Sequence, residues 1–527
     1  MRLSAGLAAT AASAALYGLA FPPLEWRPVA FVALVPFLVA LRRLGRRDAL
    51  LCAFLWAEFA SLFVASALPD AVETYFLQPR WLAWAFALCV WAGTGSLYYV
   101  GFAAAWRGVA ALPAALQPLL AAAAWVTFEL ARGRLLNDLG WFVGNPWALA
   151  GYSQVGFPAF VQVASVTGVY GVSFALVAAN AGLAELWLRR REATRGGAAR
   201  VAAAGALPAL VCLAFGVLAL REAGVPAGPG VSAALVQADV DLGSRYRPEL
   251  YGQNLDAYLG LTLQAIAEVR PALVLWPEAA LTFHLEEEPL FRATIARVLA
   301  GGDAQLVTGG PWGIPGEAPL YTNSVFVLDP TGEVRGRYDK QVLVPFAEFT
   351  PLGALDLVRR NFGRIRVFSR GSERAPLPTR AGRAGILVCN ESMLPELARR
   401  RVLDGAEILV NPSNDSWIAH RNWSRLAFHM ALMRAIEQRR TLVRISTSGP
   451  SAIVDPFGFV QIESLPKSRA VIAGKLHPRQ ELSLYARMGD AFAFGCAAAV
   501  AVALALRKRG RTGREAARPT LVPEPLS

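Results

Sequence analysis

The chain has 527 residues, of which 55% are hydrophobic and 17% are charged, and its formal net charge is +13. Soluble domains carry about 25% charged residues, so this composition and a mean hydropathy of +0.38 indicate a membrane protein. The positive charge does not indicate nucleic-acid binding, because the basic residues cluster at the ends of apolar runs without any basic-aromatic platform.

Eight apolar runs are predicted to cross a membrane, since a spanning helix needs about 20 apolar residues. They are residues 3–21, 29–41, 49–68, 82–105, 114–131, 158–187, 201–220 and 488–506. Arginine-rich clusters follow three of these runs, at 42–47, 189–200 and 507–514. Positively charged loops stay on the cytoplasmic side, so we expect both termini in the cytoplasm.

The predicted organisation follows from these runs. Residues 1–221 form a membrane domain with helices one to seven, 222–487 form an extracytoplasmic catalytic domain, 488–506 form the eighth helix, and 507–527 form a basic cytoplasmic tail that is expected to be disordered. The outer loops 69–81 and 132–157 are rich in aromatic residues. They are expected either to rim a lipid entrance or to form an ordinary interfacial aromatic belt.

The region 222–487 alternates short apolar strands with helical segments, which predicts sheets covered by helices. The predicted strands are 232–240, 272–276, 323–328, 333–338, 385–388 and 408–410, and the predicted helices are 255–269, 395–403 and 425–439. Residues Asp329–Gly332 carry a hairpin-turn signal. The fold class is therefore a polytopic helical membrane domain followed by an α/β domain.

A carboxylate ends the first of three strands that finish in a polar side chain. Glu278 follows the apolar residues 273–277, with Trp276 and Pro277 beside it. Partial burial raises the pKa of a carboxyl group, which suits a general base near neutral pH. A glutamate at a helix N-cap would give the same pattern.

A lysine follows the predicted hairpin. Lys340 comes after Tyr338 and Asp339, and Glu348 lies further on beside Pro345 and Phe346. A lysine at a strand end is often only a solvated edge charge. Its functional alternative is to stabilise the oxyanion of a tetrahedral intermediate.

One cysteine lies outside the apolar runs. Cys52, Cys89, Cys212 and Cys496 fall inside them, whereas Cys389 follows the strand 385–388 and precedes Asn390 and Glu391. Such a cysteine can be core packing, but a thiol near a base and a cation is a nucleophile. No cysteine or histidine spacing predicts a metal site, and no cofactor is expected.

Together these motifs resemble the carbon–nitrogen hydrolase (nitrilase) superfamily, which implies an αββα sandwich with a Glu278–Lys340–Cys389 triad. The membrane helices, with the stretches Asn145–Trp147 and Gly168–Phe174, resemble its membrane branch, the apolipoprotein N-acyltransferases. By that resemblance Glu348, Asn390 and Glu391 support the site, with the Asn390 N–H in the oxyanion hole. Asn390 departs from the family, which commonly has tyrosine there.

The resemblance implies the last step of bacterial lipoprotein maturation. A phospholipid, by resemblance phosphatidylethanolamine, acylates Cys389, and the thioester then acylates the N-terminal amine of a diacylglyceryl apolipoprotein in a ping-pong reaction. We expect a monomer in the bacterial inner membrane with the catalytic domain on the periplasmic side. The alternatives are a membrane-anchored amidase or nitrilase that hydrolyses a small amide, a catalytically weakened paralogue, and a transporter or scaffold with a degenerate nitrilase domain.

Overall fold

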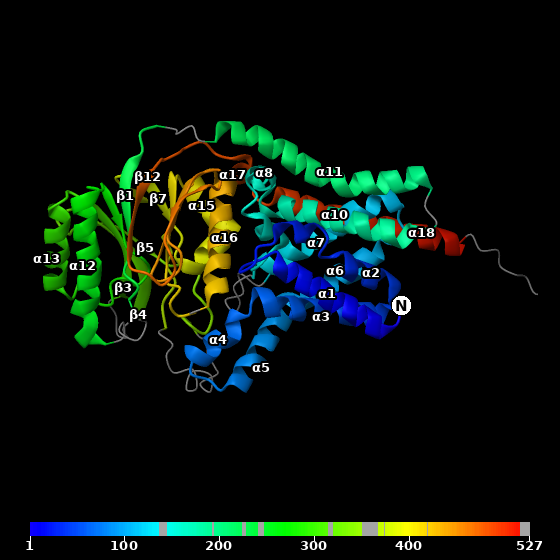
Figure 1. Ribbon diagram of the computed structural model, residues 1–527, viewed down its shortest axis with the longest axis horizontal. Helices are drawn as coiled ribbons and strands as arrows, with labels where there is room; N and C mark the ends of the chain where they lie inside the picture. The colour runs from blue at the N-terminus through cyan, green and yellow to red at the C-terminus, as the bar shows by residue number, and fades with distance from the viewer. Residues whose placement is uncertain are drawn as a thin grey trace, which may run out of the picture.

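The computed structural model describes residues 1–135, 145–191, 194–223, 228–240, 247–314, 320–349, 367–373, 375–418 and 420–516. The described chain forms a bundle of helices at one end and a pair of sheets with flanking helices at the other (Figure 1). The first and last helices both lie in the bundle, so the sheet domain is inserted between α11 (Arg195–Ala219) and the C-terminal helix α18 (Ala491–Ala516).

The bundle is built from apolar helices with a continuous buried core of small and aromatic side chains. Its remaining helices are α1 (Leu3–Leu19), α2 (Val35–Arg43), α3 (Arg46–Val64), α4 (Ala67–Thr74), α5 (Arg80–Trp91), α6 (Leu97–Gly108), α7 (Gln117–Arg134), α8 (Pro158–Val161), α9 (Ala164–Thr167) and α10 (Val169–Arg189). Short α17 (Leu484–Met488) leads into α18. Small residues let helices approach closely: a Cβ on Gly182 of α10 would lie 2.9 Å from the Cα of Gly205 in α11.

Within the described residues, five helices are long and apolar enough to cross a membrane, or six if α3 and α4 form one span bent by 63°. The prediction of eight spans is therefore met only in part. Run 3–21 forms a 17-residue helix. Run 29–41 divides into a 3-10 turn over Arg27–Phe31 and the nine-residue α2, each with a proline in its first turn. Proline lacks the N–H that a continuous helix needs.

Two other runs differ from their predicted bounds. Run 158–187 begins with the short helices α8 and α9, and α10 starts only after Gly168, whose φ is +65°. The loop expected over 69–81 contains most of α4. Helix α18 continues to Ala516, so the predicted disordered tail is wrong up to that residue, and 517–527 lie outside the described chain. Lysine and arginine favour helix and suit its C-terminal end, which explains the extension.

The sheet domain contains two six-stranded mixed sheets, in the orders β12-β1-β2-β3-β4-β5 and β11-β10-β9-β8-β7-β6. Their strands are β1 (Val231–Gln237), β2 (Leu273–Leu275), β3 (Gln305–Ile314), β4 (Leu320–Leu328), β5 (Val334–Asp339), β6 (Leu377–Thr379), β7 (Gly382–Ile386), β8 (Ile408–Ser413), β9 (Thr441–Ser446), β10 (Ala452–Val454), β11 (Val460–Glu463) and β12 (Ala470–Leu476). Parallel strands lie at the centre of each sheet, with β1-β2-β3 in one and β7-β8-β9 in the other.

The two sheets pack face to face over one apolar core that draws residues from β1 to β5 and from β6 to β10. Helices α12 (Tyr251–Glu268) and α13 (Pro289–Ala300) cover the outer face of the first sheet. Helices α15 (Pro395–Leu403) and α16 (Arg421–Gln438) cover the second sheet and face the helical bundle (Figure 1). The result is the αββα sandwich that the resemblance implied.

A buried ion pair joins the sandwich to the bundle. Arg434 and Glu437 of α16 lie 3.0 Å apart, and both side chains are fully buried. Arg434 donates to the Tyr152 hydroxyl, and Glu437 accepts from the N–H of Val169 at the start of α10. The pair itself lies within α16, and its hydrogen bonds to Tyr152 and Val169 hold the sheet domain against the helical bundle. A fully buried pair is costly to break.

Candidate active site

Glu278 lies just beyond the end of β2, after the buried residues Trp276 and Pro277. Its Oε1 accepts from Asn323 Nδ2 at 2.8 Å, and its Oε2 accepts from the N–H of Asn414 at 2.8 Å. A Cβ on Gly309 in β3 would lie 2.7 Å from the Cα of Glu278, so only glycine leaves room for this segment. The carboxylate is buried and held in one orientation.

Lys340 follows β5 and is 1% exposed. Its Nζ lies 3.3 Å from Oε1 of Glu278, and 3.0 and 2.9 Å from the two oxygens of Glu348. Asn323 Nδ2 also donates to Glu348, so one amide bridges the two carboxylates. Burial opposes the charge on Lys340, but Glu278 and Glu348 outweigh burial and hold its pKa above the ordinary value.

Cys389 opens a 3-10 turn, Cys389–Met393, beyond the end of β7. Its φ is +49°, a left-handed conformation that is costly for a residue with a side chain and is typical of functional turns. Its carbonyl accepts from Asn411 Nδ2 at 3.2 Å. Cys389 and Asn390 contribute the first N–H groups of the turn, which have no acceptor within it.

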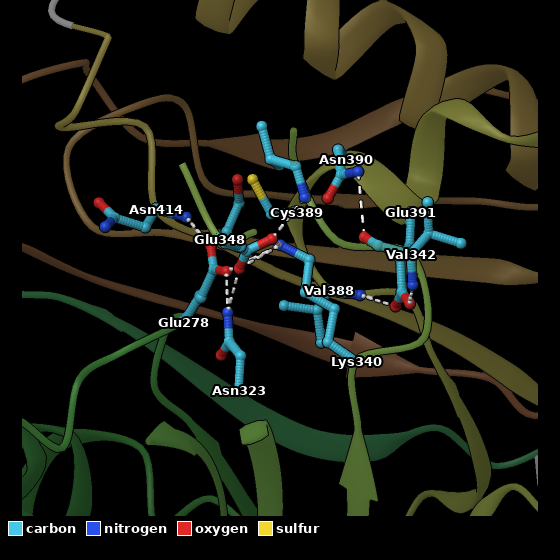
Figure 2. A network of polar contacts seen from close by, with 12 residues as sticks. Glu278, Asn323, Lys340, Val342, Glu348, Val388, Cys389, Asn390, Glu391 and Asn414 are labelled. Carbon is cyan, nitrogen blue, oxygen red and sulfur yellow. Dashed lines mark hydrogen bonds and ion pairs between the residues drawn. The ribbon is translucent and has the colours of Figure 1, made fainter. Parts of the chain in front are cut away.

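Burial, followed by the nearby carboxylate of Glu278, raises the pKa of the Cys389 thiol to about 12, while Lys340 acts in the opposite direction. The thiol is therefore protonated near neutral pH. A base must remove its proton during the reaction, because the thiolate is the nucleophile. Figure 2 shows the side chains of Glu278, Lys340 and Cys389 converging on one region.

Glu391 is buried and ties the cysteine turn to the lysine loop. Its Oε2 accepts from the N–H of Val388 at 2.8 Å, and its Oε1 accepts from the N–H groups of Gln341 and Val342 at 2.7 and 3.0 Å. The Tyr338 hydroxyl donates to the same carboxylate at 2.9 Å. These contacts orient the cysteine turn and the lysine loop, and Glu391 lies to one side of Cys389 and Glu278, next to Val342 (Figure 2).

Replacing Glu391 by alanine is expected to lower both stability and turnover. One buried N–H, two partly buried N–H groups and the Tyr338 hydroxyl lose their acceptor, each at up to about 1–3 kcal/mol, so the unfolding midpoint should fall by at least about 5 °C. Turnover should fall by about 100-fold or more, because the cysteine turn loses its anchor. Tyr338→Phe removes one donor to Glu391 and one acceptor of Arg401, and its unfolding midpoint and turnover, measured in thermal unfolding and acyl-transfer assays, should lie between those of Glu391→Ala and the unmodified protein.

Two adjoining cavities contact Cys389. One has a volume of about 110 Å³ and is lined by Glu278, Lys340, Glu348 and Cys389, together with Tyr75 and Trp417. The second, of about 100 Å³, is mostly apolar and reaches Met393, Trp417 and Trp423. Trp423 stacks on Trp147 of the membrane domain, with ring centroids 4.0 Å apart.

The structure thus brings together Glu278, Lys340, Cys389 and Glu348 around one cavity, and it places Asn390 and Glu391 in the turn beside them. The Asn390 side chain donates to the Val342 carbonyl at 3.2 Å, and its buried Oδ1 has no partner among the described residues. Within those residues no cluster of histidine, cysteine, aspartate and glutamate could hold a metal ion.

Three contributors were missed from the sequence. Asn323 bridges Glu278 and Glu348, the Asn414 N–H binds Glu278, and Tyr75 lines the cavity from the end of α4. Asn323 begins a predicted strand, and Asn414 lies in the polar stretch after β8. A polar residue at a strand end is the signal that both share, but it does not tell which carboxylate each one contacts.

Both domains match models of known protein families. Residues 13–182 match the family model described as apolipoprotein N-acyltransferase N-terminal domain, and residues 232–479 match the model described as carbon–nitrogen hydrolase. An apolipoprotein N-acyltransferase of Geobacter metallireducens is 32% identical over 92% of this chain and 92% of its own length. One from Azotobacter vinelandii is 33% identical over 90% of each.

The sandwich also aligns with solved structures. A crystal structure of a carbon–nitrogen hydrolase from Helicobacter pylori G27 is 19% identical, with a TM-score of 0.37, over 47% of this chain and 89% of that one.

Proposed function

Because the chain belongs to the apolipoprotein N-acyltransferase family, we propose that it moves an acyl chain from a membrane phospholipid to the N-terminal amine of a diacylglyceryl lipoprotein. The observation that best supports this function is that a residue of the membrane domain forms part of the wall of the catalytic cavity. Tyr75, next to the bent apolar helix pair α3–α4, lines the same cavity as Glu278, Lys340 and Cys389. The helical bundle therefore contributes to the wall of the catalytic cavity, as a site for a bilayer lipid requires.

The first half-reaction acylates the enzyme. Glu278 takes the proton from the Cys389 thiol, and the sulfur attacks the ester carbonyl of the phospholipid. Lys340 and the Asn390 N–H stabilise the oxyanion of the tetrahedral intermediate. As the C–O bond breaks, Glu278 returns the proton to the leaving oxygen, which yields a lysophospholipid and a thioester on Cys389.

The second half-reaction regenerates the thiol. The amine of the acceptor attacks the thioester carbonyl, and Glu278 receives the amine proton. The C–S bond then breaks, an amide forms, and Glu278 reprotonates the sulfur. Glu348 holds Lys340 beside Glu278 throughout, since both carboxylates lie within 3.3 Å of its Nζ.

The apolar cavity beyond Cys389 accounts for the lipid substrate. Its walls include Met393, Trp417 and Trp423, and the stack of Trp423 on Trp147 extends the apolar surface into the membrane domain. Transfer of an acyl chain from the bilayer to water costs about 0.8 kcal/mol of free energy per CH₂. A simple amidase that uses water would not need this surface.

We place the membrane domain in the bacterial inner membrane with eight crossings, both termini in the cytoplasm and the sandwich on the periplasmic side. The arginine-rich segments that follow α2 and α10, and those in the last turns of α18, support this arrangement. We further propose that phosphatidylethanolamine is the acyl donor and that the enzyme is a monomer.

Expression of this chain in bacteria depleted of their own enzyme is expected to restore growth and triacylated lipoproteins. The measurement is mass spectrometry of the N-terminal lipopeptides of a major lipoprotein. Lipoproteins that stay diacylated although the protein is inserted in the membrane would favour the amidase hypothesis instead. Hydrolysis of a small amide without release of lysophospholipid would support that hypothesis directly.

A further inference from the structure

A polar cavity of about 640 Å³ lies beside the catalytic site and has no part in the chemistry above. Its walls come from three places: the turn after α1, the segment that leads into α16, and the loops that flank β10 and β11. The turn after α1 includes Glu25, which lies 3.2 Å from Arg425 of α16. The cavity therefore sits at the junction of the membrane and catalytic domains.

Asp415 separates this cavity from the nucleophile. It lines both the polar cavity and the apolar cavity that contains Cys389. Its carboxylate accepts from Ser413 at 2.8 Å and from Arg444 at 2.6 Å, and a Cβ on Gly449 would lie 2.0 Å from its Oδ2. Asp415 is therefore fixed, and a group in the polar cavity is one side chain away from the cavity of the thiol.

Most residues that line this cavity carry polar side chains, and the charges of these side chains largely cancel. Glu25 contacts Arg425 and also His429, whose Nε2 lies 3.3 Å away, and Arg425 pairs with Glu463 as well. Lys467 has no ion-pair partner in the part of the chain that the structure describes. His420 also lines the cavity, and its Nδ1 is buried without a hydrogen-bond partner among the described residues. These walls offer donors and acceptors with little net charge, which suits a neutral polar chain.

The polypeptide of the acceptor substrate needs a binding site that offers hydrogen-bond donors and acceptors. Its acyl chains stay in the bilayer and its amine must reach Cys389, but its polypeptide continues from the same residue. Each peptide unit brings one donor and one acceptor, and leaving either buried without a partner costs about 1–3 kcal/mol. The apolar cavity at Cys389 cannot satisfy these groups, whereas the polar cavity next to it can.

We propose that the polar cavity receives the first residues of the acceptor polypeptide, those that directly follow its lipid-modified cysteine. The proposal rests on the proposed function, because it assumes a lipoprotein acceptor. It assigns the cavity to the second half-reaction alone, since the phospholipid donor has no polypeptide.

The test compares two acceptors in the full-length enzyme: a short diacylglyceryl lipopeptide and a single diacylglyceryl-cysteine amide. Ser448 lines the cavity, and Ser448→Trp should fill it. The substitution should raise KM for the lipopeptide at least about tenfold, equal to about 1.4 kcal/mol. Its KM for the cysteine amide and its rate of thioester formation from phospholipid should each stay within about twofold of the unmodified enzyme, because neither step uses the cavity.

Gln461→Trp is the matched control, because Gln461 is exposed on β11 outside the cavity. It should leave both acceptors unaffected. Lys467→Ala, on the exposed loop, is a second variant in case Ser448→Trp fails to fold, and it should raise KM for the lipopeptide by about threefold.

Three results would overturn the proposal. Equal losses with both acceptors would show that the cavity does not contact the polypeptide. Slower thioester formation would assign it to the phospholipid headgroup. Unchanged KM in the folded variants would leave the cavity without this role. If the unmodified enzyme formed no thioester at all, the proposed function itself would fail, which is a separate result.

Discussion

Replacement of Cys389 by alanine is expected to reduce acyl transfer by at least about 10⁴-fold, because no other group in the cavity can form the thioester. Cys389 is the only cysteine among the lining residues of the catalytic cavity, and its turn is held by Glu391 and Asn411. The measurement is lysophospholipid release and lipopeptide acylation by the purified enzyme in lipid nanodiscs. The variant should keep its thermal-unfolding midpoint, since a half-buried thiol is replaced by a smaller side chain.

Cys496→Ala is the control for this experiment. Cys496 is buried in α18, away from both cavities at Cys389, and its loss should leave turnover within about twofold. If Cys389→Ala retained a substantial part of normal turnover, Cys389 would not be the nucleophile.

Replacement of Glu278 by glutamine is expected to lower the rate of thioester formation by about 10³-fold, within the range that a general base contributes. Glutamine keeps the size of the side chain and can still accept from the Asn414 N–H, but it cannot take a proton. Burial, the largest cause of the raised pKa of the Cys389 thiol, remains in this variant, so little thiolate forms at neutral pH without a base. Stopped-flow measurement of single-turnover acylation gives this rate.

Glu348→Gln is the matched control, because Glu348 contacts the same lysine and the same Asn323 amide as Glu278. Glu348 holds Lys340 beside Glu278 and is not the proposed base, so its loss should weaken oxyanion stabilisation and slow acylation by about 10- to 100-fold. If Glu348→Gln were slower in acylation than Glu278→Gln, the role of base would pass from Glu278 to Glu348.

The sequence predicted the three strand ends that carry the site, because each combines a short apolar strand with a polar residue. β2 ends before Glu278, β5 before Lys340 and β7 before Cys389. The strands β3, β6, β9, β10, β11 and β12 were not predicted as separate elements. Several are only three or four residues long, too short for a periodic pattern, and their pairing depends on contacts far apart in the sequence.

In the membrane domain, the sequence predicted where the apolar segments lie but not how they bend or divide. Composition located the apolar runs, but it could not reveal the 63° bend between α3 and α4 or the division of run 29–41. The bend depends on how neighbouring helices pack, and the division of run 29–41 follows its prolines, which composition does not weigh. The bend matters for function, because it brings Tyr75 into the wall of the catalytic cavity.

The fine arrangement of the site also lay beyond the sequence. The left-handed conformation of Cys389, the bridge of Asn323 between two carboxylates and the four donors to Glu391 are tertiary features. Asn390 is the clearest case. Its departure from the family was visible in the sequence, but its contact with the Val342 carbonyl appears only in the structure.

The most direct test of the account is a pulse–chase experiment followed by intact-protein and peptide mass spectrometry. The purified enzyme is incubated with phosphatidylethanolamine in nanodiscs, and a diacylglyceryl lipopeptide is then added. We predict that the mass of one acyl chain appears on the peptide that contains Cys389, disappears after the chase, and reappears as an amide on the lipopeptide amine. An acyl group on another residue, or loss of the thioester to free fatty acid without lipopeptide acylation, would contradict it.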